Sequence, residues 1–204
     1  GAYVYYFENY VSKNSLSDFI SPIIDFLSSI GINFFGSDPV SAGFGLFNAG
    51  GIIFMIIGIG LSKMLADKYG KRNVFGVFLF ISTLFILVFY VLSPDSINLI
   101  FGAQIFHGFF YGITIPLLWA MIADVADYSE WKNNRRATAI IFSAMMVGLK
   151  LGLSIGGALV ASILGSYGYV PNSVGEQTES AILGTKMLVS IFPSIPFLVA
   201  AALL

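Results

Sequence analysis

Lys150 is the residue whose position most needs a chemical explanation, because it is the only charged residue between Ala137 and Gly165. The stretch is long and apolar enough for a membrane-spanning helix, and a charge at the bilayer centre costs roughly 2.5–3.5 kcal/mol on insertion scales. A lysine stem reaches about 6 Å, whereas either membrane surface lies about 15 Å from the centre, so snorkelling falls short. We expect Lys150 to face a water-filled central path and to carry function; a structural ion pair is the alternative.

The helix around Lys150 should have two unlike faces. Ser143 and Ser154 share the side of Lys150 and are candidates for a solute path. The opposite side permits a neighbouring backbone to approach closely, because it carries Gly148, Gly152 and Gly156.

A buried lysine calls for an Asp or Glu on another helix. Glu8 is the one candidate in this chain, but it lies close to the outer end of its helix. No other acidic residue of the chain lies near the middle of a span, so we expect the acidic partner in a half that is missing here.

A second group of polar side chains lies on the span near 97–127. Gln104, His107 and Tyr111 follow at i, i+3 and i+7 and share one face, as suits a solute that offers hydroxyls and stacking surfaces. An interhelical hydrogen bond explains His107 equally well. Trp119 could stack on a solute or fill the core, and Gly108 with Gly112 permits close helix packing.

The tyrosine-rich first segment adds Tyr6 as a path candidate, although tyrosines also anchor helices at membrane surfaces. Charged residues then gather at the inner end of the 97–127 span, where Asp124 and Asp127 precede Arg136. This cluster is either an ordinary solvated loop or a gate of opposite charges that opens when the conformation changes.

Composition defines the elements that must position these residues. The chain has 204 residues, of which 57% are hydrophobic and only 10% are charged. Its mean hydropathy is +0.87, so we predict an all-α polytopic membrane protein. A net charge of −1 gives no case for nucleic acid binding, and the absence of cysteine excludes thiol catalysis and disulfides.

Apolar runs predict spans near 43–62, 73–93, 97–127, 138–165 and 181–204, with a truncated sixth at 1–11. The segment 17–35 has apolar residues at helical spacing and predicts an amphipathic helix at the outer surface; a structureless loop is the alternative. The loops after 43–62 and 97–127 hold most of the Lys and Arg residues, so we expect both loops and both chain ends in the cytoplasm. One six-helix bundle of this kind suits half of a transporter built from two similar halves.

The stretch WAMIADVADYSEWKNNRR, from Trp119 to Arg136, resembles the melibiose-permease type of glycoside–pentoside–hexuronide:cation symporters in the major facilitator superfamily. Lys150 and the run from Gly165 to Asn172 continue the resemblance, and 67–72 (DKYGKR) is similar to the basic loop motif of the superfamily. The resemblance covers the whole chain as the carboxy-terminal six helices.

The resemblance implies that Lys150 lies near the cation site and sugar path, and that Asp124, Asp127 and Arg136 form a cytoplasmic gate. It also implies that the acidic cation ligands lie in the other half, so no metal site is assignable here. Met145 and Met146 depart from the polar pair of melibiose permease, which leaves a different glycoside, a pentoside or a uronide open.

We therefore expect a Na⁺- or H⁺-coupled symporter of a sugar or glycoside that works by alternating access and needs no cofactor. It should lie in a bacterial inner membrane, and its partners should be a small solute, the bilayer and the missing half. A lysolipid-type carrier of the same superfamily is the first alternative. A non-transport membrane module, such as an enzyme, is less favoured because His107 has no evident nucleophile or metal-binding companions.

Overall fold

The computed structural model describes residues 2–32, 38–171 and 177–204, and the described residues form eight helices and no strand. Five helical segments are long and apolar enough to cross a membrane. They are α3 (Pro39–Tyr69), α4 (Lys71–Val88), α5 (Ile97–Asn133), α6 (Thr138–Ser166) and the combined segment Glu179–Ala202. The chain is therefore an all-α integral membrane protein.

The segment expected to hold a truncated sixth helix, 1–11, contains a short helix. The first helix, α1 (Tyr3–Asn9), has 7 residues, and at about 1.5 Å per residue it covers only a fraction of a bilayer. Five segments of the described chain qualify as membrane spans, and the count of six helices per bundle is not confirmed.

Several helices continue past the predicted ends of the spans. α3 runs to Tyr69 rather than 62, because a helix keeps its backbone hydrogen bonds after it leaves the hydrocarbon and so includes Lys63 and Lys68. It ends at Gly70, whose φ of +83° favours glycine, and α4 starts at the next residue. α5 likewise continues to Asn133, beyond the predicted end at 127.

The last span is divided into α7 (Glu179–Val189) and α8 (Ile191–Ala202), which meet at Ser190. Pro193 explains the break, because its ring lacks an N–H and clashes with the carbonyl four residues earlier, at Val189. The two helices together cover the span that was expected near 181–204.

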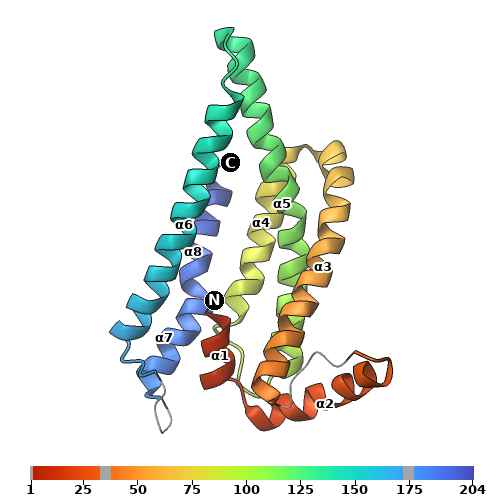
Figure 1. Cartoon of the computed structure of the whole chain (residues 1–204), viewed down its shortest axis with the longest axis vertical. Coiled ribbons are helices and arrows are strands. Elements are labelled where there is room, and N and C mark those ends of the chain that lie inside the picture. The colour runs from red at the N-terminus through yellow and green to blue at the C-terminus, as the bar shows by residue number, and fades with distance from the viewer. Residues whose placement is uncertain (1, 33–37, 172–176) are drawn as a thin grey trace.

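The outer amphipathic segment is helical as α2 (Lys13–Ser29), which lies across one end of the bundle (Figure 1). It begins four residues earlier than the predicted start at 17, because Ser15 Oγ donates to Asp95 Oδ1 at 2.8 Å and fixes this turn. Leu16 and Ile20 are buried against the bundle, whereas Phe26 is 64% exposed. The predicted end, 33–35, lies outside the described residues.

Glycines bring α3 and α5 into the closest contact in the fold. A Cβ added at Gly108 or Gly112 would overlap the carbonyl oxygen of Gly51 or Met55 on α3, and one at Gly58 would overlap that of Phe109 on α5. The close packing expected at Gly108 and Gly112 is thereby confirmed. α4 packs on the α3–α5 pair, and α8 packs on α4.

α6 is attached much more loosely. Figure 1 shows α5 and α6 meeting near the top of the view and diverging toward the other end. Within the part of the chain that the structure describes, Leu164 is the only residue of α6 that is buried. α6 is therefore an open helix beside a tightly packed group.

Candidate functional site

Lys150 lies on the open stretch of α6, between the two places where this helix is held. At one end Phe142 stacks with Trp119 of α5, with ring centroids 6.5 Å apart. At the other end Tyr167 donates to Met187 Sδ of α7 at 3.3 Å and packs against Gly184. Eight residues, or about 12 Å of helix, separate Phe142 from Lys150.

Lys150 itself is exposed and makes no ion pair with any described residue. Ser143 and Ser154 on its side of α6 are exposed as well. A Cβ added at Gly148, Gly152 or Gly156 would meet nothing within 4 Å, so no described helix occupies the glycine side. The structure thus leaves both sides of α6 open around the lysine.

Trp119 is positioned by α5 so that its ring faces α6. Its interplanar angle with Phe142 is 13°, and its exposed fraction is 37%. Phe142 and Lys150 differ by about 80° around α6, because eight residues amount to two turns and a fifth of a turn. The surface that carries Lys150 is therefore turned by about 80° from the surface that meets Trp119.

In the described part of the chain, His107 is hydrogen-bonded to α4 and does not line an open cavity. Its Nδ1 lies 2.9 Å from Ser82 Oγ and 3.2 Å from the Ser82 carbonyl oxygen. Because a carbonyl only accepts, the second contact assigns the proton to Nδ1 and leaves Nε2 as an acceptor in the neutral ring. This is the interhelical hydrogen bond that the sequence left open as an alternative.

Tyr111 and Gln104 also belong to helix interfaces. The Tyr111 ring stacks between His107 and Phe197 of α8, with centroid distances of 5.7 and 5.8 Å. Gln104 lies against Gly51 of α3, where a Cβ would come within 2.6 Å of its Nε2. Its Oε1 is buried without a hydrogen-bond partner among the described residues. Gln104, His107 and Tyr111 therefore face three different helices, α3, α4 and α8.

Tyr6 is fully buried in the core at the end of the bundle that α2 covers, where it packs edge-on against Phe89 and near Tyr10. Its hydroxyl has no partner among the described residues. A solute could contact Tyr6 only after α1 moves away from this core.

The charged residues at the carboxy-terminal end of α5 form two separate pairs. Lys71 Nζ lies 2.7 Å from both carboxylate oxygens of Asp124 and links the start of α4 to α5. Arg136 Nε lies 3.9 Å from Glu130 Oε2. Asp127 is exposed and has no ion pair in the described ranges.

Asp124, Asp127 and Arg136 are therefore not brought together. Lys71 and Glu130 are the partners that sequence reasoning missed as site residues. Lys71 could have been found, because it lies in the basic loop 67–72 that starts the helix next to α5. The sequence marks Ser82 less clearly as a hydrogen-bond partner, because it is only one of two adjacent hydroxyl residues inside an apolar run.

Apolar spans, a glycine-packed helix pair and a lone lysine on an open helix define a polytopic membrane protein. The chain belongs to the MFS/sugar transport protein family of the major facilitator superfamily, whose model matches residues 26–204. This confirms the resemblance to sugar:cation symporters.

Three relatives illustrate the similarity. The "Uncharacterized 29.9 kDa protein in crtE 3'region" of Pseudescherichia vulneris is 36% identical over 70% of this chain and 50% of its own length. The "Uncharacterized symporter YjmB" of Bacillus subtilis (strain 168) is 33% identical over 71% of this chain and 31% of its own. The "Glucuronide carrier protein homolog" of Escherichia coli (strain K12) is 29% identical over 73% and 33%.

The chain thus spans half or less of these relatives. No solved structure matches it.

Proposed function

We propose that this chain forms one half of a secondary transporter that carries a sugar or glycoside together with Na⁺ or H⁺ by alternating access. Membership of a sugar transport family supports the solute class, and a relative named a glucuronide carrier supports a uronide among the candidates. The observation that carries the coupling proposal is Lys150, a charged residue on an open helix without an ion pair among the described residues.

In this proposal the open side of α6 faces a central path shared with an amino-terminal half. Trp119 and Phe142 lie where α5 meets α6, so a solute ring could stack on Trp119 when these helices separate. Ser143 and Ser154 would offer hydroxyls along the same side. The acidic ligands of the coupling ion would come from the other half, within reach of the Lys150 ammonium.

The ion pairs Lys71–Asp124 and Arg136–Glu130, at the carboxy-terminal end of α5, support a gate. Lys71 and Asp124 join α4 to α5 and would separate if these helix ends moved apart. We place this basic end in the cytoplasm of a bacterial inner membrane, following the positive-inside rule. α2 then covers the outer end.

Uptake by proteoliposomes of the full-length protein tests this proposal. Candidate sugars, glycosides and uronides are compared under imposed Na⁺ and pH gradients, with lysolipid as the alternative cargo. Lys150→Ala should lower gradient-driven uptake about 5- to 150-fold, the usual range of coupling between two sites. The matched control is Lys63→Ala, which removes an exposed lysine of α3 and should leave uptake unchanged.

Full gradient-driven uptake by Lys150→Ala would refute the coupling role. Uptake of lysolipid without sugar would replace the solute class, and uptake of neither would favour a non-transport module.

A further inference from the structure

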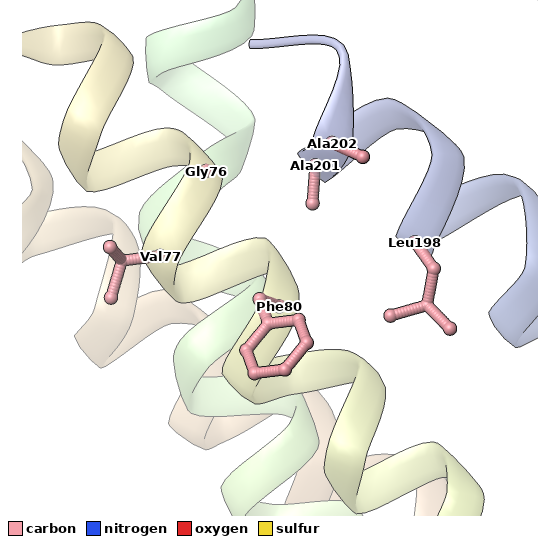
Figure 2. A pocket seen from close by; sticks show the side chains of 6 residues that line it. All are labelled: Gly76, Val77, Phe80, Leu198, Ala201 and Ala202. Carbon is pink, nitrogen blue, oxygen red and sulfur yellow. The ribbon is translucent and has the colours of Figure 1, made fainter.

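An apolar groove of about 480 Å³ runs between α4 and α8. Figure 2 shows its walls, with Gly76, Val77 and Phe80 on α4 opposite Leu198, Ala201 and Ala202 on α8. None of these six side chains carries a polar group. The volume is in the range of small-molecule sites, and the missing side chain at Gly76 helps to keep the groove open.

The groove lies on a different side of α4 from its packed face. The packed face contains Leu79, Ser82 and Ile86, which are buried, whereas Val77 is 55% and Phe80 is 47% exposed. An apolar groove on the exposed side of a membrane-spanning helix is a surface that an acyl chain can occupy.

Polar and basic residues lie at one end of the same groove. Arg72 precedes Gly76 by four residues and Asn73 precedes Val77 by four, so each lies one turn, or about 6 Å, nearer the α3–α4 junction on nearly the same face. A second cavity of about 320 Å³ shares Val77 with the groove and adds Tyr69 and Asn73 to its wall.

Arg72 is the cation available there. Its neighbour Lys71 is engaged by Asp124, whereas Arg72 is exposed and has no ion pair within the described residues. Lys68 Nζ is placed over the Tyr69 ring, 5.1 Å from its centroid. An uncommitted guanidinium at the end of an apolar groove matches a phosphate attached to an acyl chain.

We propose that the α4–α8 groove binds an acidic phospholipid. One acyl chain lies along Gly76, Phe80 and Leu198, and the phosphate binds Arg72 with Asn73 and Tyr69 near the glycerol region. The proposal does not depend on which solute the transporter carries or on its coupling ion.

Native mass spectrometry of the full-length protein, purified from mixed phosphatidylglycerol and phosphatidylcholine, tests the site. The wild-type protein should retain phosphatidylglycerol in preference to phosphatidylcholine. Arg72→Gln should lower this preference about fivefold, the factor expected for one basic residue at an anionic surface. Arg135→Gln is the matched control, because it removes an exposed arginine from a different loop.

Two variants test the groove itself. Gly76→Leu fills it from α4 and Ala202→Leu fills it from α8, and each should lower lipid retention. Gly60→Leu places the same side chain on an exposed part of α3 with nothing within 4 Å of the new Cβ, and it should retain lipid like the wild type.

Equal retention of the two lipids, or an unchanged preference in Arg72→Gln, would overturn the proposal. Retention that survives both filling variants would also overturn it. If the other half of the transporter covers the groove, no lipid will be retained there and the proposal fails.

Discussion

Substituting one glycine at the α3–α5 crossing should destabilise the protein, while the same substitution six residues earlier on α5 should not. An added Cβ at Gly108 would overlap the carbonyl oxygen of Gly51 and lie 3.1 Å from its Cα. These are backbone atoms, so no side chain can rotate away and the two helices must separate. An added Cβ at Gly102 would meet nothing within 4 Å.

The magnitude follows from a comparison of the two variants. Both Gly→Ala changes gain about 0.5–1 kcal/mol from the higher helix propensity of alanine. Only Gly108→Ala adds overpacking, which typically costs about 1–3 kcal/mol. The difference in free energy of unfolding between the variants should therefore be about 1–3 kcal/mol, with Gly108→Ala the less stable.

Thermal unfolding of the purified full-length variants in one detergent measures this difference. A unit of 150–250 residues changes its Tm by roughly 2–4 °C per kcal/mol, so the two midpoints should differ by roughly 2–12 °C. Equal midpoints, or a higher midpoint for Gly108→Ala, would show that α3 and α5 do not cross at the distance described here.

Two further predictions concern the ends of the bundle. Lys71→Ala should change stability by less than about 1 kcal/mol, because Lys71 and Asp124 are 43% and 54% exposed. If the pair is a gate, the single change should still lower uptake, and the exchange Lys71→Asp with Asp124→Lys should restore it; no recovery would contradict the gate. At the other end, hydrogen bonds from Ser15 and then Ser12 lower the pKa of Asp95 below its ordinary value of 3.8. The ionised Asp95 carboxylate therefore contributes its full stabilisation of the folded state above pH 3.8, and this contribution is lost as the pH falls through the lowered pKa. Amide hydrogen-exchange protection of α2 should fall in this range, and Ser15→Ala should lower it already at neutral pH; protection independent of pH would contradict the role of Asp95.

Hydropathy located the spans because a bilayer imposes a minimum apolar length on every helix that crosses it. It could not give their full lengths, since Lys63 and Lys68 extend α3 beyond the hydrocarbon without breaking its hydrogen bonds. The break at Ser190 was not expected either, because 181–204 is predominantly apolar and carries no charge apart from Lys186. Pro193 was the signal that could have predicted it.

Glycine spacing predicted faces but not partners. Gly108 and Gly112 meet α3 closely, whereas Gly148 and Gly152, with the same spacing, meet no described residue within 4 Å. A four-residue repeat places small residues on one side of a helix, and which helix approaches depends on the tertiary arrangement. For the same reason the sequence could not decide between a solute contact and the Ser82 hydrogen bond for His107.

The exposure of α6 has different consequences for its apolar residues and for Lys150. Lipid tails are as apolar as leucine, so exposed residues such as Leu153 and Ile155 need no protein partner inside a bilayer. Lipid cannot relieve the cost of the lysine charge, and the stem is too short to reach either surface from the centre. In the working transporter the Lys150 side of α6 must therefore meet water, an anionic group or polar protein atoms. This requirement, rather than the number of exposed leucines, is the physical reason to place the transport path beside α6.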